Sequence, residues 1–133
     1  MRYLALCENH LFTKTFASGT KKHTKTISIY TQKDRRAYKI AKDNPEKKYL
    51  NRVGISVSGK FGNAVERNRA KRIIREAYRQ IDRERELVSG KLIVIVPREG
   101  IKGKKMKQVK KDMLYIMKSL SLLKDCAVVN KHE

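Results

Sequence analysis

The residues of this chain that could do chemistry are mainly basic, and they concentrate between positions 60 and 83, where eight Lys or Arg accompany three Asp or Glu. A helix places residues three and four positions apart on one side, so part of this segment forms a basic stripe about 100° wide. The stripe consists of Asn68, Lys71, Arg72, Arg75 and Arg79, flanked by Arg67 and Arg69. Glu76 alone cannot balance these cations, which repel one another unless a polyanion neutralises them. The pattern therefore predicts phosphate binding in preference to a solvated helix face with a few ion pairs.

The sequence offers no comparable support for catalysis or metal binding. Cys7 and Cys126 lie near opposite ends, and His10 beside Cys7 would need two further ligands to hold zinc. The chain has no glycine-rich nucleotide-binding motif and no recognisable arrangement of Ser, His and Asp. A Mg²⁺-dependent nuclease would need converging carboxylates, whereas the 13 acidic residues are scattered. We therefore expect no catalytic residue and no metal site in this polypeptide.

A strand, a turn and a helix position the basic stripe. Val53, Ile55 and Val57 alternate with small or polar residues, which predicts a half-buried strand. Two glycines then permit a tight turn. Asn63 and Glu66 have the spacing of a capping box at a helix start. The opposite face of this helix carries a predicted core stripe of Ala70, Ile73, Ile74, Ala77 and Ile81.

The rest of the chain predicts further elements around this unit. Helices are predicted over 9–18, 82–90 and 105–123, strands over 24–31 and 91–96, and irregular connections over 32–51 and 100–105, with a short helix around 34–42 as an alternative within the first connection. The strand over 91–96 is continuously apolar, which is typical of a strand buried on both faces. The last ten residues are expected to fray.

Three aromatic residues lie in the first of these elements. Phe12 and Phe16 are four residues apart, so one helix face carries both rings, and packing in the core is the simplest interpretation. In the following strand, Ile27 and Ile29 share one face, whereas Tyr30 lies on the other, polar face.

Composition bounds the class of protein. With 133 residues, of which 40% are hydrophobic, the chain suits a single α/β domain over residues 1–133, with helices packed on a small sheet. The net charge of +20 implies a polyanionic partner, which could be RNA, DNA or an anionic membrane. The longest apolar run, 92–96, is too short to span a bilayer, and the first residues lack the apolar core of a signal peptide. We expect a cytoplasmic protein without a membrane partner.

The central segment resembles a known signature. Residues 52–58, 62–65 and 67–77 read Arg-Val-Gly-Ile-Ser-Val-Ser, Gly-Asn-Ala-Val and Arg-Asn-Arg-Ala-Lys-Arg-Ile-Ile-Arg-Glu-Ala. This pattern closely resembles the bacterial ribonuclease P protein component, and the Arg-Asn-Arg triplet followed by Lys-Arg is highly specific. The resemblance includes Phe12, Phe16, Gly19 and Tyr30 and covers about residues 8–123. One departure is Gly59-Lys60, where the family often has two lysines.

The resemblance implies a fold and a function. The fold would be a two-layer α+β sandwich like the second domain of a small-subunit ribosomal protein, with a left-handed βαβ crossover against the usual rule. The protein would be the non-catalytic subunit of ribonuclease P, an endoribonuclease whose RNA subunit performs Mg²⁺-dependent removal of the 5′ leader of precursor tRNA. Magnesium would be bound mainly by that RNA, with one protein expected per RNA.

The resemblance also implies two sets of site residues. The catalytic RNA would be bound by Lys60, Asn63, Arg67, Asn68, Arg69, Lys71, Arg72 and Arg75. The precursor-tRNA leader would lie in a cleft formed by Phe12, Phe16 and Tyr30, since exposed rings stack on unpaired bases without demanding a sequence. A small basic ribosomal or architectural RNA-binding protein is the alternative function, and an autonomous nuclease is a third.

Overall fold

The computed structural model describes residues 4–6, 9–34, 51–85, 87–88 and 90–123 of the chain. Its centre is a five-stranded sheet in the order β1-β4-β5-β3-β2. The strands are β1 (Leu4–Ala5), β2 (Thr20–His23), β3 (Ile27–Lys33), β4 (Arg52–Ile55) and β5 (Lys91–Pro97), and the helices are α1 (Asn9–Ser18), α3 (Ala64–Glu84) and α4 (Met106–Ser119). In the part of the chain that the structure describes, no helix is both long enough and apolar enough to cross a bilayer.

The pairing of β5 organises the sheet, because this strand lies between β3 and β4. It runs antiparallel to β3 over seven residue pairs and parallel to β4 over four. Since α3 connects β4 to β5, the three elements form the βαβ unit that the resemblance implies. Strand pairing does not define the hand of this crossover, which stays a prediction.

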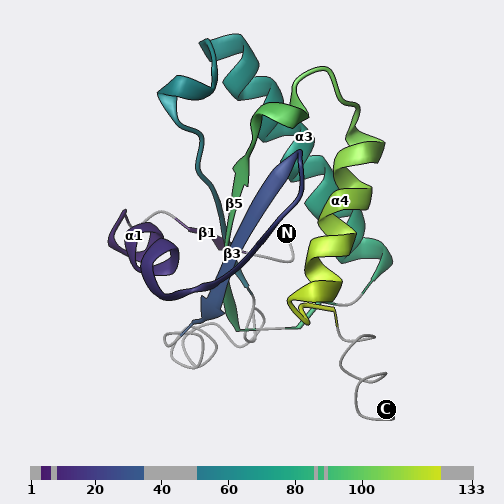
Figure 1. The fold of residues 1–133 in the computed structure, drawn as a ribbon. Helices are drawn as coiled ribbons and strands as arrows, with labels where there is room; N and C mark the ends of the chain where they lie inside the picture. The colour runs from purple at the N-terminus through teal and green to yellow at the C-terminus, as the bar shows by residue number, and fades with distance from the viewer. Residues whose placement is uncertain (1–3, 7–8, 35–50, 86, 89, 124–133) are drawn as a thin grey trace.

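Helices cover both faces of the sheet, α3 and α4 on one side and α1 on the other (Figure 1). The larger core lies under α3 and α4, where Ile27 and Ile29 of β3 meet Ile93 and Ile95 of β5. On the other face, Leu92 and Val94 are buried in a smaller cluster with residues of α1. The predicted fold class, an α/β domain with helices on a small sheet, is confirmed, and β5 is buried on both faces as its sequence indicated.

The sequence patterns that predicted the start of α3 and its buried face are confirmed. Asn63 Oδ1 accepts a hydrogen bond from the Glu66 backbone at 2.9 Å, and Glu66 Oε1 accepts one from the Asn63 backbone at 3.2 Å, which completes the capping box. Four of the five predicted core residues are buried, while Ile73 is half-buried at the edge of the core. Tyr78, which the stripe did not include, is buried with a relative exposure of 2%.

For several other elements, the predicted first or last residues are wrong. The separate helix predicted over 82–90 does not form: α3 continues to Glu84, and Leu87 then makes an antiparallel bridge to Leu123. Helix α4 stops at Ser119, four residues before its predicted end, because the backbone turns at Ser121, which has a φ of 57°. Neither β1 nor β2 was predicted, because one has two residues and the other, Thr20–His23, is polar and exposed.

The strand predicted over 53–57 is shorter and more buried than its alternation suggested. It ends at Ile55, and Gly54, expected on an exposed face, is buried beneath Phe12 of α1. The hypothetical helix over 34–42 lies almost wholly outside the described residues, as do both cysteines and the tail after Leu123.

A buried ion pair joins the end of β3 to the start of β4. Arg52 Nε and Nη2 donate to the two carboxylate oxygens of Asp34 at 2.7 and 2.8 Å, and both residues are at most 5% exposed. The neighbouring Asn51 bonds to the Val88 carbonyl and accepts from the Lys91 amide. These bonds hold the two ends of the long connection against the start of β5.

Candidate RNA interface

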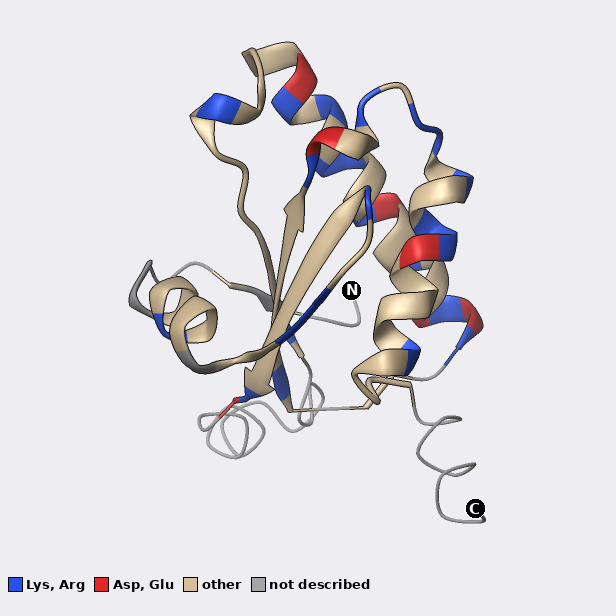
Figure 2. Cartoon of the chain, viewed as in Figure 1, with Lys and Arg blue, Asp and Glu red and all other residues tan. Residues whose placement is uncertain are grey.

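The basic stripe predicted on α3 faces solvent. Asn68, Arg72, Arg75 and Arg79 are exposed, and Lys71 is half-buried. The capping box and the buried opposite face fix their direction, because they set where α3 starts and how it is rotated on the sheet. Blue segments recur along α3 in Figure 2. Of these residues, Arg79 is paired, its Nη1 lying 3.2 Å from Glu76 Oε2.

Three other residues assigned to the RNA face make bonds within the protein. Arg67 Nη1 donates to the Gly62 carbonyl at 2.9 Å, and Arg69 Nη2 donates to the Lys104 carbonyl at 2.7 Å. Asn63 uses its side-chain oxygen to cap α3. The structure thus separates a solvent-facing group, Arg72 and Arg75 among them, from a group that fastens α3 to adjacent loops.

Phe16 and Tyr30 form an aromatic pair at the surface. Their ring centroids are 4.9 Å apart with planes at 88°, and Phe16 is 39% exposed. The pair is held because Gln32 Nε2 of β3 donates to Thr15 Oγ1 of α1 at 2.9 Å, which fixes the helix against the strand. An edge-to-face pair with open sides can accept a nucleotide base.

Phe12 is packed rather than open. Its ring lies against β4 so closely that a Cβ on Gly54 would be 2.4 Å from Cζ. The same ring lines a hollow of about 400 Å³ between α1 and α3, with Lys71, Arg75 and Arg79 also among the lining residues. The fold therefore brings one residue of the expected leader cleft beside three residues of the basic stripe.

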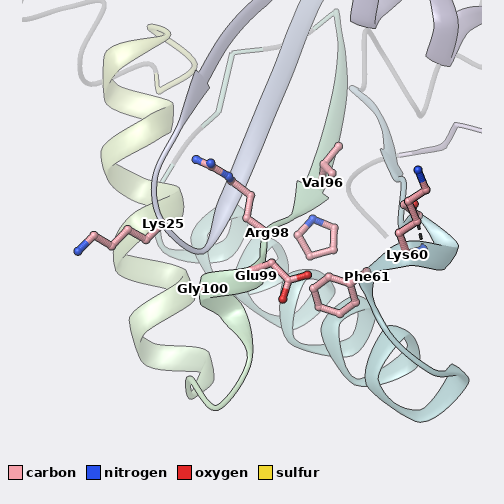
Figure 3. Close-up of a pocket in the computed structure, with 9 residues that line it drawn as sticks. Lys25, Lys60, Phe61, Val96, Arg98, Glu99 and Gly100 are labelled. Carbon is pink, nitrogen blue, oxygen red and sulfur yellow. Dashed lines mark hydrogen bonds between the residues drawn. The ribbon is translucent and has the colours of Figure 1, made fainter.

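A second hollow, of about 570 Å³, surrounds Lys60 at the end of β5 (Figure 3). Lys25 and Arg98 line its other side, with Phe61 and the carboxylate of Glu99 between them and Lys60. Sequence reasoning missed Lys25 and Arg98, because neither lies on the helix that carries the basic stripe. The one sequence signal for Arg98 was its position directly after Pro97, which closes the apolar strand 91–96.

The chemistry that the described residues bring together is that of binding. No group of three or more His, Cys, Asp or Glu within them could hold a metal ion. The described surface presents exposed guanidinium groups along α3 and, on α1, the exposed ring of Phe16. Guanidinium groups suit phosphate oxygens, and rings suit base faces, so the arrangement fits a nucleic acid strand.

Comparison with known proteins gives one family. The family model described as Ribonuclease P matches residues 2–121. The Ribonuclease P protein component of Bacillus velezensis is 35% identical over 119 residues, which cover 90% of each chain. The corresponding component of Brevibacillus brevis is 33% identical, over 94% of this chain and 89% of its own.

Solved structures agree with the fold. The RNase P protein of Staphylococcus aureus superposes with a TM-score of 0.69 and 24% identity, covering 89% of this chain and 95% of that one. The RNase P protein of Thermotoga maritima gives a TM-score of 0.64 and 25% identity, covering 84% and 92%. With the family model spanning nearly the whole chain, this protein belongs to the ribonuclease P protein component family.

Proposed function

We propose that this protein is the RNA-binding subunit of ribonuclease P and assists removal of the 5′ leader from precursor tRNA. The observation that carries the proposal is the exposed face of α3, where Lys71, Arg72 and Arg75 stand together beside the hollow that also contains Phe12. A cluster of cations with an adjacent aromatic cleft suits an RNA that has both structured and unpaired parts.

Within this proposal the two surfaces have different partners. The α3 face binds the catalytic RNA, because exposed cations on one rigid helix can follow a phosphate backbone. The Phe16–Tyr30 pair takes a base of the single-stranded leader. The resemblance assigns Lys60 to the catalytic RNA, and Lys25 and Arg98, which line the same hollow, supply further phosphate contacts.

The chemistry itself belongs to the RNA subunit. Mg²⁺ is held mainly by that RNA and activates water for hydrolysis, while the protein binds and orients the two RNAs. One protein per RNA and a cytoplasmic location are part of the same proposal.

The test is processing of precursor tRNA by purified components. We expect cleavage with protein and ribonuclease P RNA together at a low Mg²⁺ concentration at which neither component is active alone. Arg72→Gln/Arg75→Gln should lower the rate. Lys33→Gln/Lys91→Gln removes the same charge at the facing ends of β3 and β5, away from α3, and should leave the cleavage rate unchanged.

Three results would contradict the proposal. Cleavage by the protein alone would identify an autonomous nuclease. Tight RNA binding with no effect on leader removal would identify the architectural alternative. Equal loss with both charge variants would mean that the α3 face has no special role.

A further inference from the structure

The outward face of α4 carries a second basic stripe that the proposed function does not use. Its members are Lys107, Lys111, Tyr115 and Lys118, all exposed. At about 100° per residue they fall within about 80° of one another, on the side of α4 opposite its buried residues. Blue segments recur along α4 in Figure 2.

Tyr115 is the aromatic member of this face. Few large hydrophobic side chains of the described residues are exposed, and Tyr115 is one of them, with a relative exposure of 55%. Lys22 of the edge strand β2 places its Nζ 5.9 Å from the ring centroid. An aromatic ring on a helix face that also carries lysines can stack on a base while the lysines contact phosphates.

Acidic residues near α4 are turned away from this face. Asp112 accepts a hydrogen bond from Thr26 Oγ1 at 2.5 Å on the flank next to the sheet. On the other flank, Lys110 Nζ lies 2.7 Å from Glu84 of α3. Within the described parts of the chain, none of the lysines of the α4 stripe, nor Lys22, has a salt bridge. A bound polyanion would neutralise their mutual repulsion.

The α4 stripe is distinct from the α3 stripe. The seam between the two helices holds the Lys110–Glu84 pair and the contact of Lys110 with Gln80. Both basic stripes lie away from this seam, on different sides of the helix pair. A nucleic acid bound along α3 therefore leaves the outward face of α4 open to another segment.

We propose that the α4 stripe, with Lys22 of β2, is a second RNA-binding surface that takes a single-stranded segment and stacks one base on Tyr115. The inference rests on the proposed function only in taking the polyanion to be RNA. A membrane surface fits less well, because a helix that lies in a bilayer interface buries an apolar face, and the outward face of α4 has only Tyr115.

The experiment measures binding of a fluorescein-labelled oligouridylate to the full chain at several salt concentrations. Lys111→Gln/Lys118→Gln should make the slope of log affinity against log salt shallower by about 1.4, the value for two phosphates of a single strand. The matched control, Lys33→Gln/Lys91→Gln, should change the slope much less. Thermal unfolding of each variant verifies that the fold is intact.

Variants of Tyr115 distinguish the contribution of base stacking from that of charge attraction. Tyr115→Leu should weaken binding about 5- to 150-fold, whereas Tyr115→Phe, which keeps the ring, should bind normally. Equal slopes for the lysine variant and its control would overturn the proposal. Normal binding by Tyr115→Leu would overturn it too, since it would leave only a general attraction of charge.

The same variants distinguish this inference from the proposed function. In an Arg72→Gln/Arg75→Gln background, the α4 changes should lower affinity by the same factor as in the unaltered protein, because separate sites act additively. Failure of the α4 variants alone rejects the second surface. Failure of the α3 variant to weaken binding of ribonuclease P RNA rejects the proposed function instead.

Discussion

Arg69 and Arg72 lie three residues apart on α3, yet their guanidinium groups have different surroundings. Arg69 donates to the Lys104 carbonyl, whereas Arg72 is exposed. We expect Arg72→Gln to weaken binding of ribonuclease P RNA without changing the unfolding midpoint. Arg69→Gln should also lower the free energy of unfolding, by about 0.5–1.5 kcal/mol, because an intramolecular hydrogen bond is lost. RNA affinity and urea unfolding are measured on both variants. A destabilised Arg72→Gln would contradict the assignment.

The aromatic pair gives a second prediction for single residues. Phe16→Ala and Tyr30→Ala should each weaken binding of precursor tRNA by about 1–3 kcal/mol, since a stacked base loses its ring. Binding of mature tRNA, which lacks the leader, should not change. If Phe16 were a core residue, its loss would instead cost about 3–5 kcal/mol of stability, and both RNAs would bind more weakly. Its 39% exposure favours the first outcome.

At the scale of elements, Gly54 allows α1 to lie on the sheet. A methyl group there would meet the Phe12 ring at 2.4 Å and Leu6 Cβ at 3.2 Å. We expect Gly54→Ala to destabilise the protein by about 1–3 kcal/mol through overpacking, as measured by urea unfolding. In a Phe12→Ala background the same change should cost less, because the clash is removed. Equal costs in both backgrounds would show that the two residues do not interact.

The Asp34–Arg52 pair gives a further prediction at this scale, because it fastens β3 to β4. Arg52→Met or Asp34→Ala alone should cost about 3–5 kcal/mol, since either change leaves a buried charge without this partner. The double variant should cost less than the sum of the two. Denaturant unfolding of all four proteins provides the coupling energy. A cost below about 1 kcal/mol for each single change would place the pair in the class of surface ion pairs.

At the scale of the whole molecule, the charge of +20 should make RNA binding strongly dependent on salt. If the α3 face neutralises about five phosphates, it contributes a slope of about −3.5 to −4.5 to log affinity against log salt. Additional phosphate contacts by the α4 stripe would make this slope steeper. Binding of ribonuclease P RNA is measured over a range of salt concentrations, with Lys33→Gln/Lys91→Gln as the charge control. A slope near zero would contradict phosphate binding by this molecule.

Local sequence patterns determined the elements that rest on local interactions. The start of α3 was predictable because Asn63 and Glu66 are three residues apart and bond to each other's backbone. The faces of α3 and β3 followed from their periods, since burial of one face fixes the direction of every other side chain. The two-residue β1 was not predictable, because Leu4 pairs with Arg52, far along the chain. The four residues of β2 are polar and exposed, so they carry no pattern of burial.

The sequence by itself determined that a basic helix face exists and, through its motif, which family the chain belongs to. Only the tertiary structure decided which members of that face are available to RNA. Arg69 is bound to a carbonyl 35 positions later in the chain, and Phe12 is packed against Gly54. Likewise, Lys22 and Tyr115 meet only because β2 and α4 pack together. Spacing along the chain specifies the direction of a side chain on its element, whereas its partners are set by packing between elements.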